Sequence, residues 1–497
     1  MRSEGLFVRV ECLRSRPGLR GLKGADTNLE PEHFDMVVIG AGPAGEKAAA
    51  QAAYFGRSVA IVERERRPGG AAVLNAGVPT KTLRETALYI TGFRARNVYG
   101  IGLELDPYAA LSHLRSRTDQ VVKTMTQAVE DNIARHGIKL ICGIARLGPD
   151  RSVLVACEDG TSRLLKPEVI VIATGSRPFH PPDVPFEDPD IEDSESVIGI
   201  ERPLRSIVVV GGGAVGCEYA SIFAALGVEV TLVDSASRLL PFMDAEISDL
   251  LASVFRKMGL RVLLGAGRAS VEREPAGLKL TLASGEVIRP EKVLFAAGRA
   301  GNTEGLGLTE AGVETDERGR VLVDDHFRTT ATGIYAAGDV IGPPALASVS
   351  MEQGRVAACH ALGIAFKETV DPLPPFGVYS IPEVAMVGLT EEAARARGLV
   401  YEIGRAWFAR NTRATIAGQP EGLLKLVFDR ADKRLLGVHI LGTSAAELIH
   451  QGQAVLHFGG TIDYFIHSTF NVPTESEAYK YAAYDGLQRL VSPKHGD

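Results

Sequence analysis

The sequence predicts an α/β fold in which one parallel-sheet unit is inserted in another and an α+β domain follows. Two observations predict it. A pattern of strand, glycine turn, helix and strand occurs twice, at 34–63 and at 207–234. Short apolar runs that end in a glycine turn occur at 169–175, 293–298 and 334–339, which is typical of buried parallel strands. Strands that alternate with helices in this way form doubly wound sheets.

The first copy of the pattern predicts a dinucleotide site. A strand at 34–39 leads into the turn and an alanine-rich helix from Glu46 to about Phe55, and a second strand ends in Glu63. The first glycine of such a turn allows the chain to bend, the second lets a pyrophosphate approach the backbone, and the third lets helix and strand pack. The acid accepts hydrogen bonds from ribose hydroxyls. The turn reads Gly40-Ala41-Gly42-Pro43-Ala44-Gly45.

The second copy has the same order and spacing. A strand at 207–210 precedes the turn, a helix runs from Glu218 to about Leu226, and the next strand ends in Asp234. From the third glycine to the acid is 63 − 45 = 18 residues in the first copy and 234 − 216 = 18 in the second. Two dinucleotide sites in one chain predict a flavoenzyme that also binds a nicotinamide nucleotide. The second turn reads Gly211-Gly212-Gly213-Ala214-Val215-Gly216.

We expect three domains after an N-terminal extension, which is residues 1–33 and lacks the apolar stretch of a signal peptide. The flavin-binding domain is discontinuous and comprises 34–182 and 300–372. The nicotinamide-binding domain, 183–299, is inserted in it. A proline-rich linker occupies 372–375. After it, apolar strands such as 423–428 and 435–441, followed by helices, predict an α+β domain at 373–497.

The composition argues against several classes of protein. Lysine and arginine number 54 and aspartate and glutamate 61, a net charge of −7, so we expect no surface for nucleic acid or an anionic membrane. No apolar run reaches the about 18 residues of a membrane helix. The five cysteines are odd in number and lack metal-ligand spacing, so we expect no metal site and a reducing, cytoplasmic setting.

The chain resembles the flavoprotein family that contains lipoamide dehydrogenase, glutathione reductase and mercuric reductase, over about 34–490. Besides the two glycine turns, the resemblance rests on Ala173-Thr174-Gly175, Ala297-Gly298-Arg299 and Ala337-Gly338-Asp339. Within the family it looks most like the branch of soluble pyridine nucleotide transhydrogenases. The residues of that closer likeness are Gly175-Ser176-Arg177-Pro178, the run from Cys217 to Phe223, and Phe470-Asn471 before Pro473-Thr474.

The resemblance implies two Rossmann-like dinucleotide-binding domains, a C-terminal dimerisation domain and a homodimer. It implies FAD as cofactor and NAD(H) and NADP(H) as co-substrates, hence a NAD(P)+ transhydrogenase of the Si-specific type. The cofactor-binding residues that it implies are Gly40, Gly42, Pro43, Ala44, Gly45, Glu63, Gly70, Lys81, Ala173, Thr174, Gly175, Gly211, Gly213, Val215, Gly216, Asp234, Arg238, Gly298, Arg299, Gly338 and Asp339.

The chain departs from the disulfide reductases of this family at their reacting groups. The two cysteine positions of the Cys-x4-Cys pair hold Ala72 and Gly77, and the position of the acid-base histidine holds Val472. The glutamate that orients that histidine is present as Glu477. The joint loss is coherent, because the histidine moves protons for thiols and has no task without them.

Two catalytic residues remain by resemblance, Lys81 and Glu218, which meet beside flavin N5 in the family. A cation there stabilises the charge of reduced flavin, and the carboxylate holds the lysine. An ordinary ion pair on a domain seam is the alternative. Without the dithiol, electrons leave to a second nicotinamide, which makes a transhydrogenase, or to a small acceptor, which makes an NADH-dependent diaphorase or quinone reductase. A non-catalytic FAD-binding module is the third possibility.

Asp234 argues for NAD(H) over NADP(H), because an acid at this position binds the ribose diol and repels a 2′-phosphate. Arg238 lies four residues further on and offers a forked donor that suits a phosphate. The sequence therefore favours NAD(H) binding over NADP(H) binding.

Overall fold

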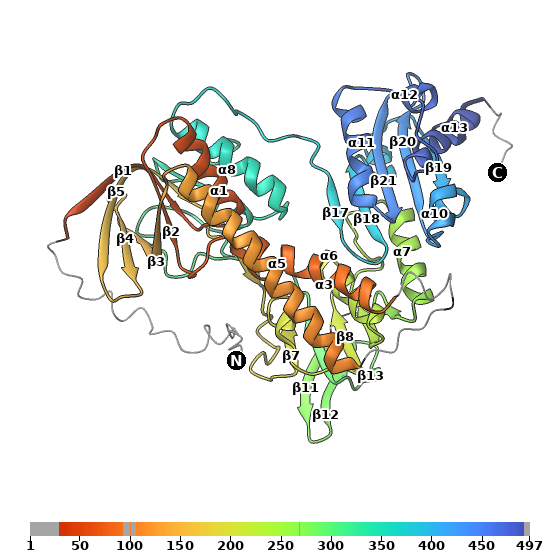
Figure 1. Ribbon diagram of the computed structural model, residues 1–497, viewed down its shortest axis with the longest axis horizontal. Helices are drawn as coiled ribbons and strands as arrows, with labels where there is room; N and C mark the ends of the chain where they lie inside the picture. Colours follow the sequence, from red (N-terminus) through yellow and green to blue (C-terminus); the bar gives the residue numbers. More distant parts are fainter. Residues whose placement is uncertain (1–28, 93–99, 101–105, 268, 492–497) are drawn as a thin grey trace, which may run out of the picture.

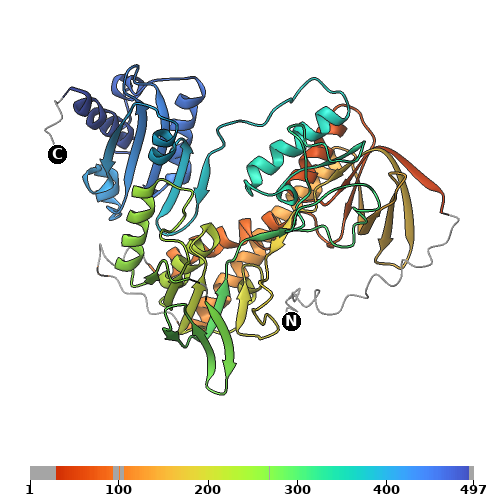
Figure 2. The ribbon, with the colours of Figure 1, turned by 180° about the vertical axis from the view of Figure 1, so that it is seen from behind.

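The computed structural model describes residues 29–92, 100, 106–267 and 269–491. The described chain forms three lobes (Figure 1). The first and the last lobe lie on opposite sides of the molecule, and the middle lobe lies below and between them. The segment 362–375 crosses from the first lobe to the last, as the view from behind also shows (Figure 2).

The first lobe is built on a mostly parallel sheet. Strands β1 (Pro31–Ile39), β2 (Val59–Glu63), β3 (Lys139–Leu147), β5 (Ser162–Ile172) and β16 (Ile334–Ala336) run parallel, and β4 (Val153–Cys157) is antiparallel between β3 and β5. Helices α1 (Pro43–Tyr54) and α8 (Ala347–Ala361) pack against each other beside this sheet. Since β16 pairs with β5, the chain returns to the first sheet after the middle lobe.

The start of β1 corrects the predicted limit of the N-terminal extension. Pro31, Glu32 and His33 are paired with β5, so they belong to the sheet. The reason is electrostatic as well as geometric, because the Glu32 carboxylate accepts hydrogen bonds from Lys139 on β3 and from Arg163 on the adjacent β5. Residues 1–28 of the predicted extension lie outside the described residues.

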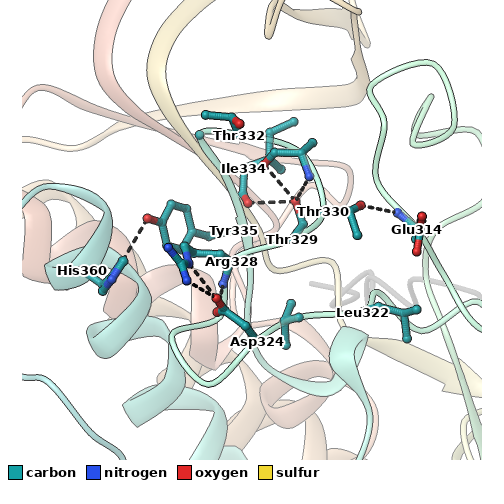
Figure 3. A pocket seen from close by; sticks show the side chains of 13 residues that line it. Glu314, Leu322, Asp324, Arg328, Thr329, Thr330, Thr332, Ile334, Tyr335 and His360 are labelled. Atoms are coloured by element: carbon teal, nitrogen blue, oxygen red, sulfur yellow. Dashed lines mark hydrogen bonds and ion pairs between the residues drawn. The ribbon is translucent and has the colours of Figure 1, made fainter.

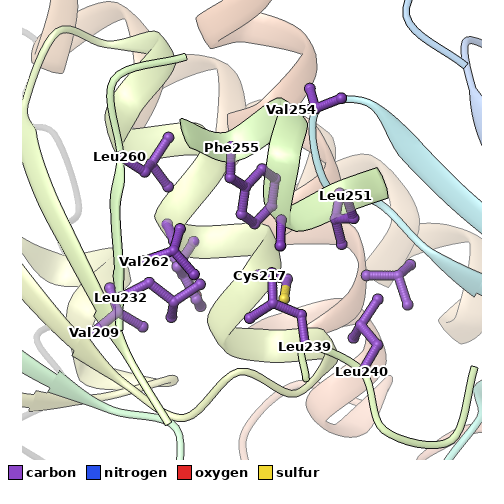
Figure 4. Close-up of a cluster of buried hydrophobic side chains, with 14 of the residues drawn as sticks. Val209, Cys217, Leu232, Leu239, Leu240, Leu251, Val254, Phe255, Leu260 and Val262 are labelled. Carbon is purple, nitrogen blue, oxygen red and sulfur yellow. The ribbon is translucent and has the colours of Figure 1, made fainter. Parts of the chain in front are cut away.

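The middle lobe contains the second glycine turn. Its parallel sheet has the order β10 (Arg261–Leu263), β9 (Glu229–Val233), β8 (Ser206–Val210), β14 (Lys292–Phe295) and β7 (Ile191–Asp193). Helices α6 (Ala214–Ala225) and α7 (Ala245–Lys257) cover it, and Phe255 and Leu251 of α7 pack in one cluster with Cys217 of α6 (Figure 4). A three-stranded sheet follows, with β11 (Ser270–Glu274), β12 (Gly277–Thr281) and β13 (Val287–Ile288).

The chain enters and leaves the middle lobe through one short ladder. Strand β6 (Ser176–Pro178) pairs antiparallel with β15 (Arg299–Gly301). Other α-helices among the described residues of the first two lobes are α2 (Gly70–Leu74), α3 (Gly77–Ile90) and the long α5 (Pro107–Arg135), and α3 packs against α6 of the middle lobe. This contact brings the two predicted dinucleotide units together.

Both helices that follow a glycine turn begin earlier than the sequence predicted. Helix α1 begins at Pro43 rather than Glu46, and α6 begins at Ala214 rather than Glu218. The reason is that Gly42 and Gly213 serve as N-caps with extended backbone, so the turn itself supplies the first helical residues.

The last lobe is an antiparallel sheet with helices. The strand order is β17 (Phe376–Val378), β18 (Glu383–Gly388), β21 (Leu435–Gly442), β20 (Leu423–Asp429) and β19 (Tyr401–Trp407). The described fold confirms the predicted α/β class with a C-terminal α+β part. Its helices are α9 (Glu391–Ala396), α10 (Thr412–Ile416), α11 (Ala445–His457), α12 (Asp463–His467) and α13 (Glu477–Val491).

A buried cluster of charges joins the last lobe to the middle lobe. The Lys425 ammonium on β20 is 1% exposed and donates to Asp244, the N-cap of α7, at 2.9 and 3.0 Å and to Glu391 at 2.7 Å. Arg405 on β19 donates to Glu246 of α7 at 2.7 Å. Buried charges persist only where they are paired, so this cluster fixes how the two lobes sit.

No helix among the described residues is long and apolar enough to cross a membrane. Within the same residues, no group of three or more His, Cys, Asp or Glu side chains is placed to hold a metal ion.

Candidate functional site

The first and third glycines of both turns are required by the backbone. Gly40 has φ +106°, and a Cβ there would lie 2.4 Å from the carbonyl oxygen of Ala173. Gly211 has φ +119°, and its Cβ would lie 2.5 Å from the oxygen of Ala296. A Cβ on Gly45 or Gly216 would lie 1.9 or 1.8 Å from the oxygen of the first glycine of its turn. Glycine is therefore needed at these four positions for steric reasons.

The second glycine of each turn leaves space for a ligand. Gly42 and Gly213 are the N-caps of α1 and α6, and because a glycine has no side chain, no cap side chain accepts the N–H groups of the first helical turn. A Cβ on Gly213 would meet nothing within 4 Å of the described atoms. A Cβ on Gly42 would lie 3.7 Å from Cα of Gly70, which has φ +57°. Free N–H groups at a helix N-terminus bind phosphate oxygens.

The two predicted ribose acids bond to their own turns. Glu63 accepts the N–H of Ala41 at 2.7 Å and that of Glu65 at 2.9 Å, and burial raises the pKa of its carboxyl above the ordinary value. Asp234 accepts the N–H of Gly212 and, at 2.6 Å, that of Ala236. Each acid thus closes its turn and leaves lone pairs for ribose hydroxyls.

The residues around the first turn fit the flavin dinucleotide that the family resemblance implies. Oγ1 of Thr174 and Oδ1 of Asn75 are buried and have no hydrogen-bond partner in the part of the chain that the structure describes. Thr174 follows β5 beside Gly40, and Asn75 follows α2. Buried polar atoms without partners are rare, and a bound ligand is one way to satisfy them.

The motif residues after β16 lie against the first turn. Gly338 has φ +83°, and a Cβ there would lie 2.8 Å from that of Ala44. Asp339 accepts hydrogen bonds at 3.2 Å from the hydroxyls of Ser176 and Ser350. The structure thus brings the predicted residues of three separate segments, around 44, 174 and 339, to one edge of the sheet.

Lys81 and Glu218 form an ion pair where α3 meets α6. The Lys81 ammonium donates to the two Glu218 carboxylate oxygens at 3.0 and 2.8 Å. The Glu218 side chain is 9% exposed and that of Lys81 34%. The ammonium therefore has one open side, while the carboxylate is enclosed.

Tyr379 completes this arrangement, and the sequence did not indicate it. Its backbone N–H donates to Glu218 at 2.9 Å, and its ring centroid lies 5.0 Å from Nζ of Lys81. Burial raises the pKa of the Tyr379 hydroxyl, and nearby carboxylates add to the rise. The residue belongs to the segment between β17 and β18, so the site draws on all three lobes.

Three further predicted cofactor-binding residues contact the protein itself. Arg299 donates to the hydroxyl and carbonyl oxygens of Ser176, each at 2.7 Å, and to Glu195 at 3.2 Å. Gly298, with φ +96°, makes the turn before it. Arg238 is half exposed and donates to Asp249 at 3.1 Å.

The positions of the missing dithiol are adjacent in space. A Cβ on Gly77 would lie 2.6 Å from the carbonyl oxygen of Ala72, so the loop between α2 and α3 is tight there. Val472 is 63% exposed on the last lobe. Cys217 is buried, burial raises the pKa of its thiol far above the ordinary value, and its Sγ donates to the oxygen of Gly212 at 3.4 Å. Such a thiol is inert.

A cavity of about 650 Å³ lies elsewhere in the first lobe. Arg328, Tyr335 and His360 line it, and the Tyr335 hydroxyl lies 3.0 Å from Nδ1 of His360 (Figure 3). None of the predicted site residues lines this cavity.

Comparison with known proteins agrees with this geometry. A family model described as pyridine nucleotide-disulphide oxidoreductase matches residues 34–354, and the dimerisation domain of that family matches 374–483. The soluble pyridine nucleotide transhydrogenase of Mycobacterium tuberculosis (strain ATCC 25177 / H37Ra) is 43% identical over 460 residues, 92% of this chain and 98% of the relative. That of Pseudomonas putida (strain W619) is 39% identical over 461 residues, 92% and 99%.

A solved structure agrees as well. The Cu(II) complex of the HOCl-induced flavoprotein disulfide reductase RclA from Escherichia coli matches with a TM-score of 0.82 at 27% identity, over 93% of this chain and 100% of that chain. The resemblance seen in the motifs is thereby confirmed, and the chain belongs to the pyridine nucleotide-disulphide oxidoreductase family.

Proposed function

We propose that this protein is an FAD-dependent NAD(P)+ transhydrogenase, which moves hydride between NAD(H) and NADP(H) without a redox disulfide. The observation that carries the proposal is the Lys81–Glu218 pair, which remains while Ala72 and Gly77 stand where the dithiol would be. A structural relic has no need of a lysine held this way beside two complete dinucleotide turns. The names of the relatives from Mycobacterium tuberculosis and Pseudomonas putida support the same function.

The first-lobe turn and its neighbours would hold FAD, which supplies a hydride acceptor. The N–H groups at the start of α1 bind the pyrophosphate, and Glu63 binds a ribose. Thr174 would bind another part of the dinucleotide, because its hydroxyl is otherwise unsatisfied. Asp339 would do so as well, by its place in the family motif. The turn at Gly211–Gly216 and Asp234 bind the nicotinamide nucleotide in the same way.

Lys81 provides positive charge at the reacting end. Glu218 holds its ammonium with both carboxylate oxygens, and the Tyr379 N–H fixes one of those oxygens. A preorganised cation in a partly dry site stabilises negative charge more than water does. The role of Lys81 is therefore electrostatic. Transhydrogenation also needs no net proton, which suits a site without the acid-base histidine.

Asp234 bears on which nicotinamide binds better. Its carboxylate accepts the N–H groups of Gly212 in the glycine turn and of Ala236 in its own loop, which holds a negative charge where a 2′-phosphate would lie. Arg238 is paired with Asp249 on the surface, and such exposed pairs are weak, so its guanidinium is free to exchange that partner for a phosphate. The aspartate also favours the second candidate function, an NADH-dependent diaphorase or quinone reductase.

We further propose a homodimer in the cytoplasm. The matched dimerisation domain supports the dimer, and the name of the relatives, together with the absence of cysteine pairing in the sequence, supports the location.

The test is to follow both half-reactions by the flavin absorbance of anaerobic protein. NADPH is expected to bleach the flavin and NAD+ to restore its colour within the time of one turnover. Bleaching by NADH alone, with no bleaching by NADPH, would favour the diaphorase. A flavin that neither nucleotide bleaches would favour the non-catalytic module.

A further inference from the structure

Arg84 is a buried arginine that the proposed mechanism does not use. It lies on α3, three residues after Lys81, and its side chain is 5% exposed. Its Nε donates to the carbonyl oxygen of Ser380 at 3.0 Å, and its guanidinium pairs with Glu383 at 3.2 Å. It also pairs with Glu85, which is exposed. The guanidinium thus spans two residues of one segment in the last lobe.

That segment, 379–383, touches the Lys81–Glu218 pair. The Tyr379 N–H donates to the Glu218 carboxylate, and the Ile381 N–H donates to the hydroxyl of Ser221 at 3.1 Å. Both acceptors belong to α6. The segment is therefore fastened to α3 through Arg84 and to α6 through its own backbone. It therefore connects α3 and α6, the two helices that carry Lys81 and Glu218.

We infer that Arg84 is a positioning residue for the reaction, because it fastens segment 379–383 so that the Tyr379 N–H holds Glu218 and Glu218 holds Lys81. The inference rests on the proposed function for the role of Lys81. Arginine suits this task because its planar fork donates in two directions at once, to a carbonyl and to a carboxylate. Lysine has no such fork.

Burial makes this contact decisive for the geometry. The Glu383 side chain is 12% exposed, and that of Glu218 is 9% exposed, so water does not readily replace lost partners. When Arg84 is removed, the Ser380 carbonyl loses its donor and Glu383 loses its cation, although it keeps the N–H of Ala446 at 3.2 Å, and the segment moves to find other donors. The Tyr379 N–H then leaves Glu218, and the carboxylate no longer has a fixed orientation.

Amide hydrogen exchange on the flavin-loaded, full-length protein tests the first step. Exchange at the amides of Tyr379 and Ile381 is expected to become at least about tenfold faster in Arg84→Met, because their hydrogen bonds to Glu218 and Ser221 open more often once the segment is no longer held to α3. Arg405→Met is the matched control, since Arg405 also links the last lobe to another lobe but through Glu246. Unchanged exchange in Arg84→Met would overturn the inference.

A double-mutant cycle tests the second step. Arg84→Met is expected to slow flavin reduction by NADH about tenfold and to lower the equilibrium constant for flavin reduction by a similar factor, about 30 mV in midpoint potential. In the Lys81→Met background the same substitution is expected to add nothing, because it acts through the pair. Additive effects, or a Lys81→Met protein that reduces as fast as wild type, would contradict the inference.

Arg84→Lys keeps the test decisive if Arg84→Met yields no folded protein. The lysine retains the charge and one donor. We therefore expect amide exchange at Tyr379 and Ile381 that is faster than in the wild type, and a loss in the rate of flavin reduction that is smaller than in Arg84→Met. If these amides exchange at the wild-type rate in Arg84→Lys, a forked donor is not required at position 84 and the inference is overturned. The outcomes are independent of NADPH, so a wild-type protein that fails to transfer hydride from NADPH to NAD+ refutes the proposed function and not this inference.

Discussion

Glu63 and Asp234 make the same pair of hydrogen bonds in two different lobes. Each carboxylate accepts the N–H of the second residue of its own glycine turn, Ala41 or Gly212, and the N–H two residues beyond itself. The repeated sequence pattern is therefore also a repeated hydrogen-bond pattern. In each lobe it holds the turn in shape through the acid that we propose to bind a ribose.

Glu63→Gln is expected to weaken FAD binding and to spare the fold. Burial raises the pKa of Glu63, so the folded protein bears the cost of a buried charge, and that cost grows as pH rises through the folded-state pKa. The glutamine amide removes the cost of the buried charge. It also takes away a charged hydrogen-bond acceptor, which is worth about 1.5–3 kcal/mol. Unfolding of the apoprotein at pH 8 should occur at the same or a higher temperature, with FAD affinity at least about tenfold lower. A wild-type FAD affinity would contradict the assignment.

Asp234→Asn is expected to shift the nucleotide preference toward NADPH. The amide still accepts from one backbone N–H but no longer repels a 2′-phosphate, and like charges in a binding site cost several kcal/mol. The ratio of kcat/KM for NADPH to that for NADH should rise at least about tenfold in flavin-reduction assays. An unchanged ratio would show that another residue sets the preference.

Lys425→Met is expected to destabilise the joint between the middle and last lobes. It leaves the buried Asp244 and the partly buried Glu391 without their cation, and an uncompensated buried charge typically costs about 3–5 kcal/mol. The midpoint of urea unfolding at pH 7 should fall accordingly. Lys279→Met, which removes a partly exposed lysine of the β11–β12 hairpin that pairs with the exposed Glu272, should have little effect.

The same cluster predicts a pH dependence. Burial raises the pKa of Glu391, but the hydrogen bond and charge of Lys425 outweigh burial, so the pKa lies below its ordinary 4.5. Its contribution to stability is therefore complete above about pH 4.5 and is lost as pH falls through the folded-state pKa. The stability difference between wild type and Lys425→Met should narrow below that pH. A constant difference down to pH 3 would contradict this account of the cluster.

Lys81→Met is expected to slow flavin reduction by NADH about 10²–10³-fold, the usual effect of removing a preorganised charge from a reacting site. Stopped-flow absorbance measures it, and Lys279→Met again serves as the control. Flavin binding should be kept, because the glycine turns and Glu63 are untouched. If Lys81→Met reduces at the wild-type rate, the ion pair is structural only.

The parts of the fold that the sequence predicted are those with local signals. Apolar runs and glycine spacing predicted the two turns and the strands beside them, β1, β2, β5 and β16 in the first sheet and β8, β9 and β14 in the second, since these depend on neighbouring residues. The outer strands β3, β4, β7 and β10 were not predicted. The helix starts at Pro43 and Ala214 were missed, because capping by a glycine backbone has no side-chain signal.

The site was predictable only where a family motif marked it. Lys81 and Glu218 stood at motif positions, whereas Tyr379 and Arg84 act through contacts between residues far apart in the chain. Lys425 lies in β20, which was predicted as an apolar strand without any role for this lysine. A charged residue inside an apolar strand is the signal that would have suggested a buried ion pair.

The most direct test of the proposed function is anaerobic transfer of hydride from NADPH to a thionicotinamide analogue of NAD+, followed by absorbance in the presence of arsenite, which binds dithiols. The account predicts steady turnover that arsenite does not inhibit, because Ala72 and Gly77 carry no thiols. No transfer from NADPH, while NADH still bleaches the flavin, would contradict the transhydrogenase and favour the diaphorase.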